Sequence, residues 1–164
     1  MRKNLPYLLL VAVLITADQI TKTLILKTIP PGSNRTIIPG FFDLSHVQNR
    51  GAIFGFFSRS GSSAVYLILT LASLLALCLI VYYFLKSPHS EWMLKITLSL
   101  ILAGALGNQL DRIFRGYVID FLDIYIGRSH WPSFNVADSC ISVGAGLLIY
   151  LFFFKRGTKC TLCS

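Results

Sequence analysis

Residues 60–85, SGSSAVYLILTLASLLALCLIVYYFL, form an uncharged run bounded by Arg59 and Lys86. The run holds 26 residues, and about 20 apolar residues in a helix cross the hydrocarbon core of a bilayer. The whole chain has the same character, because 54% of its 164 residues are hydrophobic and its mean hydropathy is +0.67. Soluble domains are usually less apolar than this. The sequence therefore predicts an integral membrane protein.

Three more apolar segments are long enough to span a membrane, namely residues 5–26, 92–114 and 135–154. Together with a span over 62–85 they predict an all-α membrane protein in which residues 1–164 form one domain with four transmembrane helices. The first segment could instead belong to a cleaved signal peptide, with Arg2 and Lys3 as its basic n-region. We favour a retained helix, because apolar residues resume after Lys22.

The net charge of +8 does not indicate nucleic acid binding, because the basic residues are scattered over the ends of the apolar segments. In a four-span chain one side carries short basic segments, which favours both termini in the cytoplasm. The residues on that side are Arg2, Lys3, Lys86, Lys155, Arg156 and Lys159.

Six of the seven acidic residues fall at the opposite end of the four predicted spans. Sixteen uncharged residues separate Asp138 from Lys155, which is about 24 Å of helix and shorter than a hydrocarbon core of about 30 Å. Asp138 is therefore expected at the hydrocarbon boundary, and Asp18 is expected deeper. Ionisable groups at such depths usually mark a paired or functional site. The six residues are Asp18, Asp43, Asp111, Asp120, Asp123 and Asp138.

Structural roles can explain several of these polar residues one at a time. Asp18 and Lys22 have the i,i+4 spacing of an ion pair within a helix. Asp111 and Arg112 could end the third span, with Asn108 linking helices. Asn135 or Asp138 could cap the fourth span. Such roles do not explain why so many polar groups converge on one place.

The convergence favours a pair of aspartates as a hydrolytic centre. The chain has no G-x-S-x-G or H-E-x-x-H motif, and the histidines, His46, His89 and His130, stand apart in expected loops, where solvation is usual. Two neighbouring carboxylates share one proton, so one can activate water while the other polarises a carbonyl, without a metal or cofactor. Asp138 is one natural member, and spacing leaves its partner open among Asp111, Asp120 and Asp123.

The stretch YVIDFLD, residues 117–123, resembles a short buried strand interrupted by two carboxylates. Asp120 and Asp123 therefore either face solvent or are held in place for a function, and the stretch itself does not decide between them.

Five ordered motifs over nearly the whole chain resemble the signatures of the lipoprotein signal peptidase family, also called signal peptidase II. They are DQITK (18–22), QNRGAIF (48–54), GALGNQLDR (104–112), GYVIDF (116–121) and FNVADS (134–139).

The resemblance implies a bacterial inner-membrane aspartic endopeptidase without a cofactor. Its substrate would be a diacylglyceryl-modified prolipoprotein, cut before the lipidated cysteine near the outer leaflet. We expect it to act as a monomer. The resemblance assigns Asp120 and Asp138 as the catalytic pair and leaves Asp123 out. It also implies supporting roles for Asp18, Lys22, Asn49, Asn108, Asp111, Arg112 and Asn135.

The family fold implies a small sheet formed by the first outer loop, here residues 36–57, that cradles the substrate at the membrane surface. Phe54, Phe56 and Phe57 would anchor this loop at the interface or contact the substrate lipid. The tail cysteines Cys160 and Cys163 receive no role.

A small ion- or proton-coupled transporter is the alternative, because intramembrane Asp and Lys also form proton relays. It would need a polar path through the bilayer, whereas the inner halves of the predicted spans are almost wholly apolar. Ion flux in proteoliposomes without prolipoprotein cleavage would favour this alternative.

Overall fold

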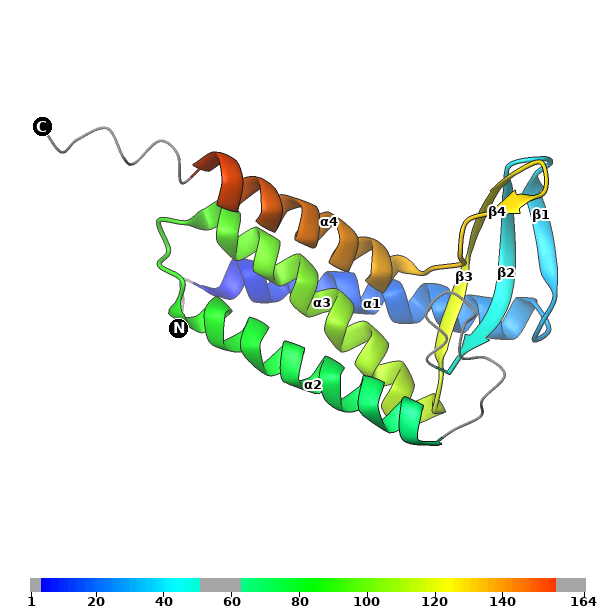
Figure 1. Ribbon diagram of the computed structural model, residues 1–164, viewed down its shortest axis with the longest axis horizontal. Coiled ribbons are helices and arrows are strands. Elements are labelled where there is room, and N and C mark those ends of the chain that lie inside the picture. The colour runs from blue at the N-terminus through cyan, green and yellow to red at the C-terminus, as the bar shows by residue number, and fades with distance from the viewer. Residues whose placement is uncertain (1–3, 51–62, 156–164) are drawn as a thin grey trace, which may run out of the picture.

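The protein is mostly helical, with a small sheet at one end of a helical bundle (Figure 1). This is a computed structural model, and it describes residues 4–50 and 63–155. Four long helices occupy the four apolar segments: α1 (Leu5–Thr28), α2 (Ser63–Lys86), α3 (Trp92–Arg115) and α4 (Val136–Tyr150), which a π-helix, η3 (Leu151–Lys155), extends.

Three described helices are long and apolar enough to cross a membrane, namely Leu5–Thr28, Trp92–Arg115 and Val136–Phe154. In α2 the described apolar stretch is Thr70–Lys86. Large apolar side chains point outward from the bundle, including Leu9, Leu75 and Phe153. Such an apolar exterior is expected where lipid rather than water surrounds a helix.

The central helix of the bundle is α3, which packs against α1, α2 and α4. Glycines bring its backbone close to its neighbours. A Cβ at Gly104 would collide with the carbonyl oxygen of Ala137, and one at Gly107 would lie 2.8 Å from Oδ2 of Asp18. Small residues permit this close packing of membrane helices. The short approach at Gly107 also leaves room for a carboxylate between α1 and α3.

The two ends of the bundle differ in their polar contacts. At the sheet end, α3 stops at Gly116, whose φ of 77° suits a residue without a Cβ. At the other end the fully buried Lys95 donates from Nζ to the carbonyl oxygen of Phe84. Phe84 lies in the last turn of α2, where carbonyl groups lack helical donors. Lys95 therefore ties α2 to α3.

The sheet has four antiparallel strands in the order β1-β2-β3-β4. They are β1 (Asn34–Ile38), β2 (Phe42–Asn49), β3 (Val118–Ile126) and β4 (Ser129–His130). The sheet predicted for the loop between α1 and α2 is confirmed in part, because β1 and β2 lie there, while β3 and β4 lie after α3. The strand character of YVIDFLD is confirmed, since β3 includes residues 118–123.

A register shift in β2 sets how the central strands pair. Leu44 pairs with Leu122, whereas the next pair is Val47 with Asp120, so β2 bulges between these positions. An apolar cluster then fixes the sheet to the end of α1. It consists of Ile25, Ile29, Ile119 and Phe121, with Leu26, Leu44, Tyr117, Leu122 and Val136 packed against it.

Some residues singled out in the sequence lie outside the described ranges. These are the three phenylalanines Phe54, Phe56 and Phe57, the part of the expected cradle after Arg50, and the tail cysteines Cys160 and Cys163.

Candidate active site

Asp120 lies in the middle of β3 with its carboxylate turned into the protein, and only 3% of the residue is exposed. Asn135 donates from Nδ2 to Oδ1 at 2.7 Å, and Asn49 donates from Nδ2 to Oδ2 at 2.9 Å. Burial, above all, raises the pKa of Asp120 to about 7, and the charge of Asp138 acts in the same direction. The two asparagine amides act against this rise. Asp120 therefore changes protonation near neutral pH.

Asp138 lies in the first turn of α4, where it forms a capping box with Asn135. Its backbone N–H donates to Oδ1 of Asn135 at 2.9 Å, and its Oδ2 accepts the N–H of Asn135 at 3.3 Å. Its Oδ1 accepts from Nδ2 of Asn108 at 2.7 Å. A carboxylate is also favoured at this position by the helix dipole. The start of α4 thus orients Asp138.

Asn135 connects the two carboxylates, because its amide nitrogen donates to Asp120 and its amide oxygen caps the helix that carries Asp138. The same nitrogen also lies within 3.3 Å of Oδ1 of Asn108 and 3.2 Å of the carbonyl oxygen of Ile119. Asn135 is fully buried. A strand and a helix far apart in the sequence therefore hold their aspartates through one side chain.

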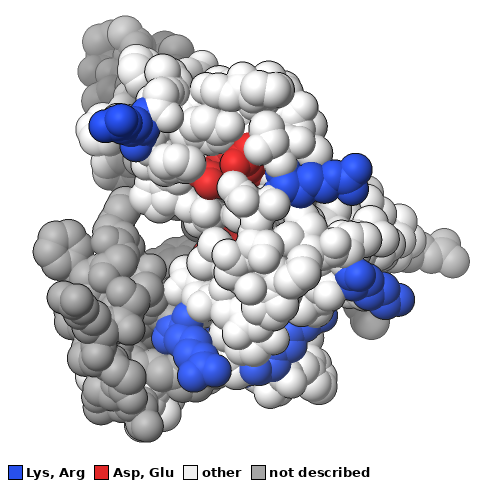
Figure 2. All heavy atoms as spheres, turned by 90° about the vertical axis from the view of Figure 1, so that its right-hand side faces the viewer, with Lys and Arg blue, Asp and Glu red and all other residues white. Residues whose placement is uncertain are grey.

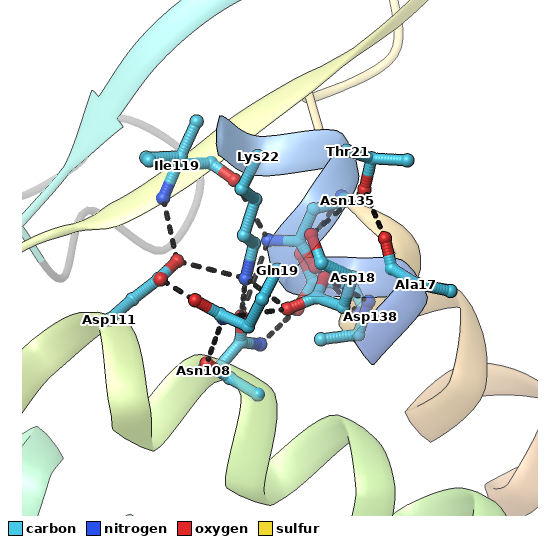
Figure 3. A network of polar contacts seen from close by, with 12 residues as sticks. Ala17, Asp18, Gln19, Thr21, Lys22, Asn108, Asp111, Ile119, Asn135 and Asp138 are labelled. Carbon is cyan, nitrogen blue, oxygen red and sulfur yellow. Dashed lines mark hydrogen bonds and ion pairs between the residues drawn. The ribbon is translucent and has the colours of Figure 1, made fainter. Parts of the chain in front are cut away.

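A buried ionic cluster lies beside this pair, at the junction of α1 and α3 (Figure 3). The ammonium group of Lys22 lies 2.8 Å from Oδ2 of Asp18 and 2.9 Å from Oδ2 of Asp111. It also donates to Oδ1 of Asn108 at 3.1 Å, and Asn108 in turn contacts Asp138. The sequence-based ion pair of Asp18 with Lys22 is confirmed. Lys22 also forms an ion pair with a second carboxylate, that of Asp111.

Both aspartates of the cluster also hold backbone groups near the candidate pair. Oδ1 of Asp18 accepts the N–H of Ala137 at 2.9 Å, which satisfies a free donor at the start of α4. Oδ2 of Asp111 accepts the N–H of Ile119 at 3.2 Å. Ala137 precedes Asp138 and Ile119 precedes Asp120. The ionic cluster therefore contacts both catalytic candidates through their neighbours.

Two members of the cluster were missed from the sequence. Gln19 donates from Nε2 to Oδ2 of Asp18 and to Oδ1 of Asp111, each at 3.2 Å. Arg115 forms an ion pair with Oδ1 of Asp111, one helical turn earlier. The i,i+4 spacing that revealed the pair of Asp18 and Lys22 could have revealed this second pair too.

Three sequence expectations need separate treatment. Asp111 forms ion pairs with Lys22 and Arg115, and Arg112 lies half-buried in the last turn of α3. Asp123 lies apart from the candidate pair and contacts the exposed His130 at 3.0 Å, as expected for an ordinary surface carboxylate. His46 was expected in a solvated loop, which was wrong.

His46 lies in β2 and is 1% exposed. The bulge of this strand includes His46, and its Nδ1 lies 2.7 Å from the carbonyl oxygen of Ile29. Pairing of β2 with the second outer loop was not visible in the sequence, so the burial of its histidine was not visible either.

The sheet end of the molecule shows acidic atoms near the middle of its surface and basic side chains around the edge (Figure 2). Within residues 4–50 and 63–155, no three His, Cys, Asp or Glu side chains are grouped as metal ligands.

Comparison with known proteins gives a consistent result. The profile of the family described as Signal peptidase (SPase) II matches residues 10–154. A protein named lipoprotein signal peptidase from Burkholderia mallei (strain SAVP1) is 43% identical over 145 residues, which is 88% of this chain and 86% of the relative. One of the same name from Syntrophus aciditrophicus (strain SB) is 43% identical over 153 residues, covering 93% and 95%.

Two solved structures share the fold. One is described as a bacterial membrane enzyme determined by the in meso method at 2.3 Å resolution, and it has a TM-score of 0.79 and 33% identity over 97% of this chain and 94% of its own. The other, described in the same words at 1.9 Å resolution, has a TM-score of 0.76 and 33% identity, covering 91% and 93%.

Proposed function

The chain belongs to the signal peptidase II family, and on that premise we propose that it cleaves prolipoproteins by an aspartic mechanism in which Asp120 and Asp138 are the catalytic pair. Removal of the signal peptide from prolipoproteins is the activity of this family. The identity of the two carboxylates, their chemistry and the geometry of the membrane insertion are the parts proposed here.

The observation that carries the proposal is the position of Asn135 between the two aspartates. Oδ1 of Asp120 accepts its Nδ2, and the helix start that it caps orients Asp138. Each carboxylate also accepts from a further asparagine, Asn49 for Asp120 and Asn108 for Asp138. Two carboxylates held by neutral amides in a buried site can share one proton, whereas a direct cation partner would keep both ionised.

The reaction needs one protonated and one ionised carboxyl group. The ionised member accepts a proton from water, and the resulting hydroxide attacks the carbonyl carbon of the scissile peptide. The protonated member donates its proton to the carbonyl oxygen, which gives a neutral tetrahedral intermediate. Collapse of that intermediate breaks the C–N bond, with proton transfer to the leaving amine. The pair then holds one proton again.

Asp120 suits the protonated role below neutral pH. Its pKa of about 7 leaves it largely protonated there, mainly because the group is buried. Asp138 is half-buried and lies at the helix start, where a negative charge is favoured. The two roles exchange in the second half of the reaction.

The remaining residues support the pair rather than react. Lys22 neutralises Asp18 and Asp111, and it contacts Asn108 beside Asp138. Asp18 and Asp111 hold the backbone N–H groups of Ala137 and Ile119. Arg112 lies at the same end of α3 and is assigned to support of the site or the substrate.

We place the protein in the bacterial inner membrane with four spanning helices and both termini in the cytoplasm. The sheet then lies at the outer leaflet, because Leu5 and Lys155 lie at the opposite end of the bundle (Figure 1). A diacylglyceryl group remains in the bilayer, so its peptide can reach a catalyst only near the interface. The sheet end is such a place. The protein acts as a monomer in this proposal.

Cleavage of a fluorescent diacylated precursor peptide tests the proposal directly. The purified full chain in detergent should cleave it before the lipidated cysteine, and Asp120→Asn and Asp138→Asn should each lower kcat by about 10²- to 10⁴-fold. Asp43→Asn is the matched control, since Asp43 is a buried carboxylate bound to Asn34 and Tyr125 at the sheet. A wild-type kcat in either variant would contradict the assignment of Asp120 and Asp138 as the catalytic pair. An inactive wild-type protein would contradict the function itself.

A further inference from the structure

Asp111 has the densest set of donors in the ionic cluster, although it lies outside the proposed catalytic pair. Its carboxylate is fully buried. Oδ2 accepts from Lys22 at 2.9 Å and from the N–H of Ile119 at 3.2 Å. Oδ1 accepts from Gln19 at 3.2 Å and from Arg115. Oδ2 therefore holds the backbone of the strand that carries Asp120. Oδ1 is held by Gln19 and Arg115, to which no role has yet been assigned.

Arg115 and Gln19 also hold each other. Nη1 of Arg115 donates to Oε1 of Gln19 at 3.0 Å as well as to Asp111. The amide nitrogen of Gln19 donates to Asp18, to Asp111 and to the carbonyl oxygen of Gly107. The guanidinium and the amide thus close a bridge from α1 to the last turn of α3. Only 23% of the Arg115 side chain is exposed, and its described contacts point inward.

The charges of the cluster show why a second cation matters. Asp18 and Asp111 are two buried carboxylates, and among the described residues Lys22 is the cation that contacts both of them. A buried carboxylate without a full counter-charge is costly. Arg115 supplies the second positive charge on the Oδ1 side of Asp111. Lys22 can then remain close to Asn108, which contacts Asp138.

The link from Asp111 to the reaction centre is short. Ile119 donates its N–H to Asp111, and its carbonyl oxygen accepts from Asn135 at 3.2 Å. The peptide groups on both sides of Ile119 are therefore held by hydrogen bonds to side chains, and the next residue in β3 is Asp120. A rotation of the Asp111 carboxylate would release one of these ties directly before the catalytic residue.

We infer that Arg115 and Gln19 are positioning residues for peptide cleavage: they fix the Asp111 carboxylate, which fixes the part of β3 that presents Asp120. The inference rests on the proposed function, and it gives neither residue a contact with substrate. An arginine suits this role because its planar group donates in two directions at once, to Asp111 and to Gln19.

Steady-state cleavage of the fluorescent diacylated peptide by the purified full chain tests the inference. Arg115→Gln should lower kcat by about 10- to 100-fold, since a small misplacement of a reacting group has effects of this size. KM should stay within about twofold of the wild-type value, because binding is not the step that Arg115 supports. Arg115→Lys should restore much of kcat by returning the charge. Arg128→Gln, which removes an exposed cation from the turn after β3, should leave both constants unchanged.

Gln19→Leu and the double variant test whether the two residues act through the same carboxylate. Gln19→Leu should lower kcat without a change in KM. The double variant with Arg115→Gln should lose clearly less than the product of the two single losses, because both changes release the same group. Multiplicative losses would mean that the residues act separately and would overturn the shared role.

The outcomes distinguish this inference from the proposed function. An inactive wild-type protein would contradict the proposed function. An active wild type with unchanged kcat in Arg115→Gln would overturn only the positioning role, as would a raised KM at unchanged kcat, which would mean contact with substrate. If Arg115→Gln fails to fold, Gln19→Leu decides: a lowered kcat at unchanged KM supports the role, and a wild-type kcat overturns it.

Discussion

Nδ2 of Asn135 lies 2.7 Å from Oδ1 of Asp120 and donates to it, while the oxygen of the same amide accepts the backbone N–H at the start of α4. A residue that caps a helix thereby also binds the carboxylate of a strand residue that we propose as catalytic. Capping and catalysis can be separated by substitution, because the hydroxyl of serine can cap a helix but is too short to replace both ends of an amide.

Asn135→Ser is expected to keep the hydrogen bond that caps α4 and to lose the hydrogen bond to Asp120. Its thermal stability in detergent should stay close to wild type, whereas kcat should fall about 10- to 100-fold, because Asp120 keeps the amide of Asn49 but loses that of Asn135. Asn135→Ala should lose the same activity and also about 0.5–2 kcal/mol of stability from the missing cap. Paired melting curves and cleavage rates check this. Wild-type kcat in Asn135→Ser would show that the bridge to Asp120 is unimportant.

The pH dependence of cleavage should report the shared proton. With the pKa of Asp120 at about 7, loss of its proton above neutral pH leaves two ionised carboxylates and no acid for the carbonyl oxygen. We expect kcat to fall with rising pH, with a midpoint near 7. A rate profile from pH 5 to 9 on the diacylated peptide measures it. A flat profile across this range would contradict the assignment.

The same pKa predicts a pH-dependent effect of Asp120→Asn on stability. Folding raises the pKa of Asp120 from 3.8 to about 7, so the folded state holds the proton more tightly than the unfolded state between these values. The stabilisation by that proton is fully present below 3.8 and is lost as the pH rises through about 7. Asparagine has no proton to lose. The variant should therefore gain Tm relative to wild type as the pH rises from 5 to 8.

That stability experiment has a direct internal control. Asp43→Asn removes a buried carboxylate of the same sheet and leaves Asp120 in place, and the partners of Asp43, Asn34 and Tyr125, carry no charge. Its Tm difference from wild type should therefore not grow over the same range. A Tm gain of Asp120→Asn that is equal at pH 5 and pH 8 would contradict the raised pKa of Asp120.

Gly107→Ala should disturb the ionic cluster without changing any charge. The new Cβ would lie 2.8 Å from Oδ2 of Asp18 and 3.3 Å from Cβ of Ala137, so the carboxylate must move. Overpacking of this kind costs about 1–3 kcal/mol. We expect a lower Tm and a lower kcat. Gly146→Ala in α4 is the matched control, because a Cβ there meets no atom within 4 Å, and its Tm should not fall.

Asp123→Asn should leave cleavage close to the wild-type rate. Asp123 shares β3 with Asp120, but its contact is the half-exposed His130 rather than the amides of the site. His130 is charged only when it is protonated and is half-exposed, and an ion pair at the surface contributes about 0–1 kcal/mol, so stability should change little as well. Kinetics with the diacylated peptide decide the matter. A large loss of kcat would mean that Asp123 takes part in catalysis and would contradict the choice of Asp120.

The sequence was most informative where the structure depends on local spacing. Uncharged length revealed the apolar helices, and the distance from Asp138 to Lys155 placed that carboxylate near one end of its helix. The i,i+4 rule found Asp18 with Lys22. The choice of Asp120 over Asp123 came from the family resemblance and stays a prediction. In the structure Asn49 and Asn135 donate to Asp120, whereas Asp123 contacts His130.

Contacts between distant segments were beyond the reach of the sequence. Pairing of β2 with β3 joins the loop before α2 to the segment after α3, and no pattern within either segment specifies the partner strand. The burial of His46 follows from that pairing and was therefore missed. Gln19 was overlooked within a quoted motif because an uncharged amide gives no charge signal, although it joins α1 to Asp111 of α3.

The bulge in β2 adds one residue to that strand beside the candidate site. Leu44 opposes Leu122, and after the register shift Val47 opposes Asp120. Two residues, Ser45 and His46, therefore lie across from Phe121, and such an extra residue bends a strand. Removal of either one would take away the bend and still leave Val47 opposite Asp120. Removal of both would shift the pairing by one residue, which would exchange the inward and outward positions of β2 up to Asn49.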